Sequence, residues 1–380
     1  MQNMDLKCLH IGKYYPPFAG GMEIFTKDLL IELARLGATP VMFAHNHEAN
    51  HTLVKKSEDS ISLYLTPSYG SLLYAPVSPF FLWHLRHVIR ETRPDILHIH
   101  LPNLSAFWLL ISRDCRRIPW VVHWHADVIV DKQPWYFKLA YRGYRLLERA
   151  LLKASKQIIV TSKPYLKASQ PLQPFVEKCK VIPLGIENLE YSTTPDHPTD
   201  LLTVLAIGRL TYYKGFHNLI KATKGVENIR VTFVGTGEEQ NNLARLIQES
   251  GAGEVVELAG YVANQKLQNM IRNCDVICLP SIERTEAFGV VLLEAMRAGK
   301  AVIASDVTGS GMGWVVDDKT TGLLCEPDSI HSLRESLLRL QENPELTLQM
   351  GAAGRKRYEN YFTIDKAANQ VLNIYKTCLD

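Results

Sequence analysis

The sequence lacks any apolar run long enough to cross a bilayer. A spanning helix needs about 20 apolar residues in a row, whereas one of the densest apolar segments, SAFWLLIS at 105–112, is far shorter. The first residues also lack a basic segment followed by an apolar one, so they do not indicate a signal peptide. We therefore expect a cytoplasmic protein without a transmembrane helix.

Neither the cysteines nor the charge indicates a disulfide-rich, zinc-binding or nucleic-acid-binding protein. The seven cysteines are odd in number and scattered, without a Cys-x-x-Cys pair, which argues against a disulfide framework or a zinc site. The net charge is +3, and the excess of basic residues in the first half is too weak for a duplex-DNA binder, so no nucleic-acid partner is expected. Residues 1–190 carry 23 Lys and Arg against 16 Asp and Glu, or +7, which suits an anionic lipid surface or an acidic substrate.

The length and the strand pattern predict two α/β domains. A chain of 380 residues exceeds the size at which one core usually stops growing. Short apolar strands alternate with helical patterns in both halves, which is typical of parallel sheets covered on both faces. The expected strands lie at 6–12, 40–45, 95–100, 120–125, 157–162, 201–208, 229–235, 254–260, 275–280 and 301–305.

A polar, proline-bearing segment at 187–200 has the composition of an interdomain linker. We therefore predict an N-terminal domain at 1–190 and a C-terminal domain at 191–364. Residues 365–380 read as one more helix, and the sequence leaves open which domain it packs against.

Ligands of open parallel sheets bind beyond the carboxyl ends of the strands, so the loops there are the candidate sites. Gly20 and Gly21 follow the first strand and precede a helix, which suits either an anion site or an ordinary turn. Arg209 and Lys214 follow a strand of the second half, and two cations there suit a pyrophosphate, although a solvated loop remains the alternative.

Two further loops of the second half are candidates of the same kind. VGTGEE at 234–239 places Gly235 directly after a strand. AGYV at 259–262 places Tyr261 and Val262 where an exposed backbone and a flat ring suit a nucleobase. Each loop is equally compatible with a plain turn.

The stretch EAFGVVLLE at 286–294 separates two glutamates by seven residues. Glu286 precedes a short predicted helix and Glu294 lies about two turns into it. The N–H groups of Phe288, Gly289 and Val290 are expected to be free at the helix start, where they suit phosphate or sugar oxygens. The alternative is that Glu286 merely favours the helix dipole, but the apolar neighbours of Glu294 argue against a freely solvated acid.

This stretch resembles the Glu-x7-Glu motif of retaining, GT-B-fold glycosyltransferases of family 4. Other motifs follow in the family's order over nearly the full length of the chain. They are PPFAGGME (16–23), HWHAD (123–127), VIPLGIE (181–187), IGRLTYYKG (207–215), VGTGEE (234–239) and LEAMRAGKAVIASD (293–306). The resemblance implies two Rossmann-like domains whose parallel sheets face an interdomain cleft.

The resemblance also implies roles for the donor site. Arg209 and Lys214 would hold the donor diphosphate, Glu294 the ribose, and the backbone of Tyr261 and Val262 the base. Glu286 and the amides of three residues at the helix start would meet the transferred sugar; these are Phe288, Gly289 and Val290.

In the N-terminal domain, the same resemblance implies that Gly20 and Gly21 approach the donor phosphates. His125 matches a histidine that lines the sugar and acceptor site, although by itself it also fits a packed strand-end histidine. Asp127 is a candidate for acceptor binding. VIPLGIE departs from many relatives, with Leu184 and Glu187 in place of Asn and Asp, so we assign it no contact.

No Asp-x-Asp element is present to hold a divalent metal on a nucleotide sugar. We therefore expect no metal and no cofactor, with cations and helix ends in the metal's place. Retention in the family is thought to proceed on one face of the sugar, with the leaving phosphate assisting the incoming hydroxyl.

The segment 132–156 carries seven Lys and Arg and a single acid, with aromatic residues near its start. Spacings of three and four place the cations on one helical stripe that includes Lys138, Arg142, Arg145 and Arg149. This pattern suits an anionic membrane carrying a lipid-linked acceptor at the inner face of the plasma membrane. A charged outer helix covering a sheet is the alternative.

Details of several motifs resemble bacterial mannosyl- and rhamnosyltransferases of surface polysaccharide and lipopolysaccharide assembly, so the expected donor is GDP-mannose and the expected acceptor a glycan or lipid-linked glycan. A UDP-sugar donor is the alternative. A GT-B nucleotide-sugar epimerase and a silent nucleotide-binding subunit also remain open, whereas nothing marks a pyridoxal-phosphate lysine of a phosphorylase.

Overall fold

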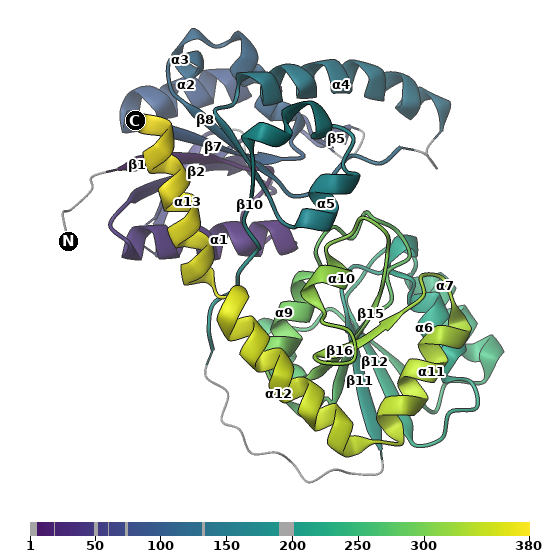
Figure 1. The fold of residues 1–380 in the computed structure, drawn as a ribbon. Helices are drawn as coiled ribbons and strands as arrows, with labels where there is room; N and C mark the ends of the chain where they lie inside the picture. The colour runs from purple at the N-terminus through teal and green to yellow at the C-terminus, as the bar shows by residue number, and fades with distance from the viewer. Residues whose placement is uncertain are drawn as a thin grey trace. The chain divides into compact units, whose positions relative to one another are not determined.

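The chain forms two compact α/β units (Figure 1). The computed structural model describes residues 6–18, 20–48, 52–59, 61–72, 75–130, 134–189 and 201–380. Unit 1 comprises Met1–Glu187 together with Ile364–Asp380, and unit 2 comprises Asn188–Thr363. The first division falls at the start of the predicted linker, most of which, at 190–200, lies outside the described residues.

Unit 1 is built on an eight-stranded sheet with the order β10-β9-β8-β7-β1-β2-β4-β3. Every neighbouring pair is parallel except β3 with β4. The strands are β1 (Lys7–Ile11), β2 (Thr39–His45), β3 (Val54–Glu58), β4 (Ile61–Thr66), β7 (Ile96–Leu101), β8 (Trp120–Trp124), β9 (Gln157–Val160) and β10 (Cys179–Val181), with a small hairpin of β5 (Ser71–Leu72) and β6 (Ala75–Pro76). The central strands β1, β7 and β8 are almost completely buried, as expected for strands covered on both faces.

The helices of unit 1 follow the strands in the alternation that the sequence predicts. They are α1 (Gly21–Arg35), α2 (Phe81–Thr92), α3 (Arg113–Arg116), α4 (Trp135–Ala154), α5 (Lys163–Ala168) and α13 (Ile364–Leu379), with 3₁₀ turns η1 (Leu104–Ile111) and η2 (Gln173–Lys178). Helix α1 ends next to Gly37, whose φ of +90° fits its role as a stop signal.

Unit 2 is built on a six-stranded, fully parallel sheet with the order β13-β12-β11-β14-β15-β16. Its strands are β11 (Leu202–Ile207), β12 (Ile229–Val234), β13 (Val256–Gly260), β14 (Val276–Leu279), β15 (Ala301–Ser305) and β16 (Gly322–Cys325). Its helices are η3 (Tyr212–Lys214), α6 (Phe216–Thr223), α7 (Gln240–Ser250), α8 (Asn264–Asn273), α9 (Val290–Arg297), α10 (Met312–Val315), α11 (Ile330–Gln341) and α12 (Pro344–Tyr361). The predicted α/β class with parallel sheets is confirmed.

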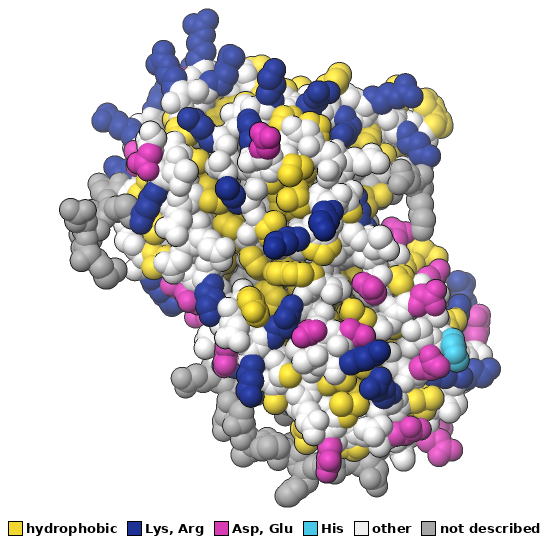
Figure 2. Space-filling view, viewed as in Figure 1, with side chains coloured by type: hydrophobic (Ala, Val, Ile, Leu, Met, Phe, Trp, Pro, Cys, Tyr) yellow, Lys and Arg dark blue, Asp and Glu magenta, His cyan; other side chains and the backbone are white. Residues whose placement is uncertain are grey.

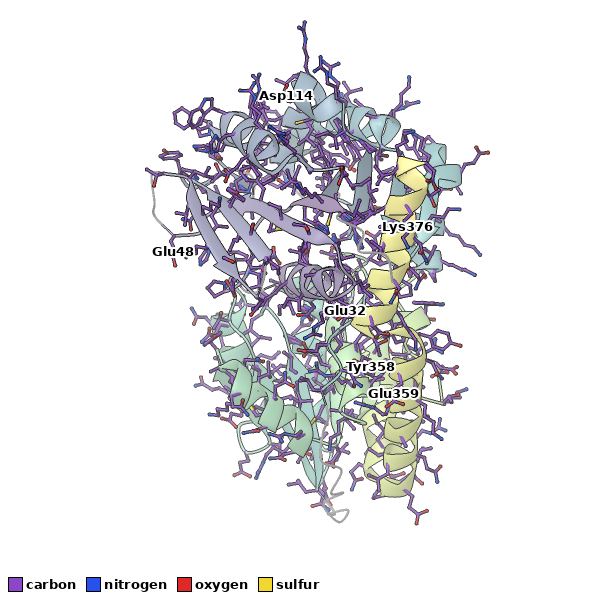
Figure 3. The ribbon with its side chains drawn as sticks, turned by 90° about the vertical axis from the view of Figure 1, so that its left-hand side faces the viewer. Glu32, Glu48, Asp114, Tyr358, Glu359 and Lys376 are labelled. Atoms are coloured by element: carbon purple, nitrogen blue, oxygen red, sulfur yellow. The ribbon has the colours of Figure 1, made fainter. Side chains whose placement is uncertain are left out.

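The C-terminal helix α13 belongs to unit 1, a question that the sequence leaves open. It packs beside α1, and its Tyr375 is fully buried and bonded to two histidines of the sheet. The exposed neighbour Lys376 marks this helix in Figure 3, where Tyr358 and Glu359 mark α12. The chain thus returns to its first unit after completing the second.

No helix in the described part of the chain is long and apolar enough to span a membrane. The seven cysteines are all unpaired, and six of them are buried.

Candidate functional site

In unit 2, the loops after β11 and β12 approach each other so closely that only glycine fits. Gly235 has a φ of +137°, and a Cβ there would lie 2.0 Å from the carbonyl oxygen of Gly208. A Cβ on Gly208 would in turn lie 3.2 Å from Nζ of Lys214. The backbone at the carboxyl ends of these two neighbouring strands therefore carries no side chains, and the Lys214 side chain lies against it.

Lys214 forms an ion pair with Glu286, the first glutamate of the spaced pair. Their Nζ and Oε2 atoms are 2.5 Å apart, and the side chains are only 12% and 14% exposed. Burial acts to lower the pKa of Lys214, but Glu286 and Tyr213 together outweigh it and raise the pKa above its usual value. The lysine is therefore a fixed, fully charged cation at the strand ends.

Arg209 lies close enough for its charge to act on the pKa of Lys214. The Arg209 side chain is exposed and has no ion-pair partner among the described residues. The structure thus brings together one paired and one unpaired cation in the loop after β11. An anionic ligand that displaced Glu286 from Lys214 would meet both.

The start of α9 presents unpaired backbone donors beside this ion pair. Gly289 caps the helix with a φ of +80°, and no acceptor among the described residues takes the N–H groups of Phe288, Gly289 or Val290. The hydroxyl of Ser310 donates to the Glu286 carbonyl at 2.5 Å, which holds the loop in place. Three fixed donors at a helix start suit phosphate or hydroxyl oxygens.

Glu294 lies on α9 in a half-buried position rather than on a wet helix face. Burial raises the pKa of its carboxyl group, and the nearby charge of Arg297 offsets this only in part. No described residue forms a hydrogen bond to this carboxylate. The group is therefore available to accept hydrogen bonds from a ligand diol.

The loop after β13 offers a different surface. Tyr261 is 77% exposed, whereas Val262 is buried. The flat ring of Tyr261 is thus free to stack on a planar group, and the predicted role of these two residues in holding a base remains a prediction.

In unit 1, Gly20 and Gly21 begin α1 as the sequence predicts. A Cβ on Gly20 would lie 2.1 Å from Oε2 of Glu23, so the buried Glu23 carboxylate already lies against the helix start. A side chain at position 20 would therefore have to displace the end of the Glu23 side chain. The predicted approach of this loop to donor phosphates is a separate matter and stays a prediction.

His125 and Asp127 follow β8 and are both buried. Nε2 of His125 lies 2.9 Å from Nδ1 of His100, and burial lowers the pKa of His125 to about 3, so the ring is neutral. Oδ1 of Asp127 accepts hydrogen bonds from Trp124 Nε1 at 2.8 Å and Ser169 Oγ at 2.6 Å. Asp127 is therefore anchored within unit 1, and its predicted acceptor role stays a prediction.

The basic stripe predicted at 132–156 lies on α4, although residues 131–133 are outside the described part of the chain. Lys138, Arg142 and Arg149 are exposed, and cationic and apolar side chains are interspersed over this region in Figure 2. Arg145 differs, because its Nη1 pairs with the buried carboxylate of Glu148 at 2.7 Å. Three of the four predicted surface cations are thus presented to solvent, and the fourth stabilises α4.

Glu148 gives a testable pH dependence. Burial raises its pKa from 4.5 to about 7 despite the Arg145 charge, so the folded chain binds a proton that the unfolded chain has released. Stability should therefore fall as pH rises from about 4.5 to about 7, by at most about 3 kcal/mol. Glu148→Gln should match the wild-type melting temperature at pH 5 and exceed it at pH 8. Equal wild-type and variant pH profiles would contradict this.

The sequence interpretation missed a group of buried polar residues in unit 1. Besides His125, four histidines and one tyrosine hydrogen-bond to one another beneath α1 and α13; these are His10, His98, His100, His123 and Tyr375. The signal was present in DILHIH and WVVHWH, where histidines two apart on a buried strand must share one face.

A cavity of about 250 Å³ in unit 1 was also not foreseen. Most of its lining is apolar, with Val128, Ile129 and Val130 after β8, Phe137 and Tyr141 on α4, and Lys13 after β1. Among the described residues of this lining, Lys13 is the one that carries a charge, and Val128 follows His125 by three residues in the chain.

Comparison with known proteins identifies both units. Residues 19–188 match the family described as Glycosyltransferase Family 4, and residues 189–357 match Glycosyl transferases group 1. The O-antigen chain mannosyltransferase C of Escherichia coli is 28% identical over 386 residues, covering 99% of each chain. The uncharacterized glycosyltransferase MJ1178 of Methanocaldococcus jannaschii is 30% identical over 296 residues, covering 78% of this chain and 79% of the relative.

Solved structures give the same result for the fold. A sucrose-phosphate synthase from Thermosynechococcus elongatus superposes with a TM-score of 0.82 at 23% identity, covering 98% of both chains. HepE from Anabaena in complex with UDP superposes with a TM-score of 0.76 at 20% identity, covering 98% of this chain and all of the other. With its two parallel-sheet units, ordered motifs and matches along almost the whole length, the chain belongs to the GT-B-fold glycosyltransferases of family 4.

Proposed function

We propose that this glycosyltransferase moves mannose from GDP-mannose to a glycan or lipid-linked acceptor, with retention at the anomeric carbon, in bacterial polysaccharide or lipopolysaccharide synthesis. The arrangement in unit 2 is the observation that carries the proposal. A largely buried lysine, an exposed arginine and three unpaired backbone N–H groups are gathered at the ends of neighbouring strands. Such an arrangement stabilises the negative charge that develops on a leaving diphosphate.

In this proposal the chain's own cations and backbone dipoles take the place of a metal. Arg209 and Lys214 neutralise the diphosphate, Glu294 accepts hydrogen bonds from the ribose hydroxyls, and the loop from Gly235 lets the backbone approach. Glu286 and the amides at the start of α9 bind the transferred sugar. Neither glutamate needs to attack carbon, because the leaving phosphate assists the incoming hydroxyl.

The mannosyl donor is supported by the full-length similarity to an E. coli enzyme named as an O-antigen mannosyltransferase. A UDP-sugar is the second candidate, supported by the similarity to HepE, whose structure holds UDP. The two donors differ in their base, so the relative affinity for guanine and uracil nucleotides distinguishes them.

A thermal-shift panel tests the donor directly. A ligand at 100 times its dissociation constant stabilises the folded chain by about 2.7 kcal/mol. GDP and GDP-mannose should therefore raise the melting temperature more than UDP-glucose or a dTDP-sugar at equal concentration. A larger shift with UDP-sugars would overturn the GDP-mannose assignment and leave the glycosyltransferase assignment intact.

Product analysis separates the remaining classes. NMR of the product formed from GDP-mannose and a mannosylated acceptor should show an α-linked sugar, as in the donor. Free epimerised sugar without acceptor would indicate an epimerase, and donor binding without turnover a silent subunit.

For the acceptor, we propose a lipid-linked glycan at an anionic membrane surface. Helix α4 exposes Trp135, Tyr136 and Leu139 beside its cations, and the cavity of about 250 Å³ presents an apolar lining next to the same helix. Aromatic and aliphatic side chains among cations are typical of helices that lie in a membrane interface.

Neutralising the exposed stripe should weaken membrane binding. Each basic residue near an anionic surface contributes about 1 kcal/mol, so Lys138→Gln, Arg142→Gln and Arg149→Gln together should reduce partition onto phosphatidylglycerol vesicles about 100-fold. A charge-matched control carries Lys224→Gln, Arg230→Gln and Lys266→Gln, all exposed in unit 2. Sedimentation at low salt is the measurement, and equal loss in both triple variants would contradict a role specific to α4.

A further inference from the structure

Five histidines lie on one face of the unit 1 sheet. The register pairs His10 of β1 with His98 of β7, and His100 of β7 with His123 of β8. His125 follows two residues later and therefore points to the same side. All five histidines are at most 7% exposed. Their rings meet Phe25 of α1 and Tyr375 of α13, two helices that pack against each other in unit 1 (Figure 1).

The five rings are neutral. Burial lowers the pKa of His10 and of His125 to about 3, and it lowers the pKa of the other three well below 6.5. A neutral imidazole carries one N–H and one bare nitrogen, so each ring can donate through one nitrogen only.

Two triads of these rings have nitrogens close enough together for a metal ion, one around His10 and one around His125. Each triad, however, contains a stacked pair. His10 lies on His98 with planes 8° apart, and His123 lies on His125 with planes 5° apart, both at 4.3 Å between centroids. The lone pairs of parallel rings lie in separate planes and cannot converge on one ion, so the geometry favours hydrogen bonds.

The hydrogen bonds form two chains that meet at the Tyr375 hydroxyl. In the first chain, Tyr375 Oη is 2.9 Å from His10 Nε2, His10 Nδ1 is 3.0 Å from His100 Nε2, and His100 Nδ1 is 2.9 Å from His125 Nε2. In the second chain, Tyr375 Oη is 2.6 Å from His98 Nδ1, and His98 Nε2 is 3.2 Å from His123 Nδ1.

The far ends of both chains are open. Among the described residues, His125 Nδ1 and His123 Nε2 have no hydrogen-bond partner. The Thr26 hydroxyl lies 3.5 Å from His100 Nδ1 but already donates to the Met22 carbonyl at 2.8 Å, so it adds no donor to the chains.

Counting protons couples the two chains. The Tyr375 hydroxyl has one proton, so it donates to one chain and must accept from the other. If it donates to His10, all five rings carry their proton on Nδ1, and Nδ1 of His125 is a donor. If it donates to His98, all five carry it on Nε2, and Nδ1 of His125 is a bare acceptor. A mixed arrangement would leave two donors or two bare acceptors facing each other inside the core.

We propose that Tyr375 and the five histidines form one hydrogen-bonded unit in which all rings share one tautomer, and that Tyr375, His10 and His100 are positioning residues that fix whether Nδ1 of His125 donates or accepts. The C-terminal helix would thereby determine the hydrogen-bonding character of a site residue three rings away. The consequence for catalysis rests on the role of His125 in the proposed function, whereas the shared tautomer does not.

Nitrogen NMR of the ligand-free chain, labelled with ¹⁵N-histidine, tests the shared tautomer. Protonated and bare ring nitrogens have well-separated shifts, so the five buried rings should all report Nδ1–H or all report Nε2–H. Tyr375→Phe removes the shared hydroxyl. The two chains should then take opposite tautomers, since each turns a bare nitrogen rather than an N–H toward the phenyl ring.

Tyr15→Phe is the matched control. Tyr15 is a buried tyrosine of the same unit whose hydroxyl has no partner among the described residues, so its loss should leave all five tautomers unchanged. Mixed tautomers in the wild-type chain, or identical histidine spectra in Tyr375→Phe and wild type, would overturn the proposal. If Tyr375→Phe does not fold and all five signals are lost, the same measurement is made on Tyr375→His. The histidine ring donates through one nitrogen and accepts through the other, so this variant keeps the link between the two chains.

A kinetic readout then tests the link to His125. With a nucleotide-sugar donor that the chain turns over, kcat should follow the tautomer of His125. Because Tyr375→Phe places the His125 proton on Nδ1, it should lower kcat about tenfold where the wild-type rings carry Nε2–H, the loss expected for one misdirected hydrogen bond, and leave kcat unchanged where they carry Nδ1–H. KM for the donor should change less than kcat. Tyr15→Phe should leave kcat unchanged. If no donor is turned over, the proposed function fails while the NMR result stands on its own. Unchanged kcat in Tyr375→Phe although the His125 tautomer has changed, or a tenfold loss although it has not, would overturn the positioning role.

Discussion

Gly215→Ala is expected to destabilise unit 2 far more than Gly251→Ala, although both glycines have nearly the same backbone. Their φ angles are +67° and +69°, a conformation that costs alanine about 1–2 kcal/mol. A Cβ at position 215 would also lie 2.1 Å from the carbonyl oxygen of Pro280, whereas nothing lies within 4 Å of one at position 251. The overlap adds about 1–3 kcal/mol or more.

Thermal unfolding measures this difference. For a unit of this size, Gly215→Ala should melt roughly 5–10 °C below Gly251→Ala. It should also lose nucleotide affinity, because the loop that it displaces carries Lys214 and packs against the loop that leads to Glu286. Equal melting temperatures for the two variants would show that the close approach to Pro280 is not maintained in solution.

Lys214→Ala is expected to weaken nucleotide diphosphate binding by about 2–4 kcal/mol, or roughly 30- to 1000-fold. The variant loses a cation and also leaves the buried Glu286 carboxylate uncompensated beside the incoming phosphates. Arg209→Ala and Glu294→Ala should each weaken binding by a similar amount. Calorimetry with GDP and UDP measures the affinities, and Lys266→Ala, an exposed lysine of the same unit, is the control.

The double variant Lys214→Ala with Glu286→Gln separates the two effects. If Lys214 itself holds phosphate, the nucleotide affinity of the double variant stays well below that of wild type. Only the part of the affinity that was lost to repulsion from Glu286 is recovered. If Lys214 serves solely to neutralise Glu286, the double variant binds as tightly as wild type. Unchanged affinity in both Lys214→Ala and Arg209→Ala would remove the diphosphate assignment altogether.

The main strands were predictable from sequence because buried parallel strands are short, continuous apolar runs. LLTVLAIG and DVICLP read correctly for that reason and became β11 and β14. The strand β4, ISLYLT, was missed although most of it is buried. The strand β3, VKKSE, was missed because it is an exposed edge with no apolar signal. The short strands β10 and β16 were missed as well, since three or four residues give too little pattern to recognise.

The loops after β11 and β14 in unit 2 show how far motif reasoning reaches. The positions of Arg209, Lys214 and Glu286 followed from strand ends and a helix start. The ion pair between Lys214 and Glu286, 72 residues apart, did not, because it depends on β11 and β14 being neighbours in the sheet. Likewise the inward turn of Arg145 depends on Glu148 being buried, which helical spacing alone does not reveal.

The sequence by itself determined the α/β class, the two-part organisation and the identity of the residues at the strand ends, since these depend on local periodicity and on motifs contiguous in the chain. Only the tertiary structure decided the strand order, the side on which α13 packs and the joining of five histidines to Tyr375, 365 residues from His10. The reason is physical. Alternation fixes which face a side chain points to, but pairing register and strand order, set by the packing of the whole unit, fix which other side chains it meets there.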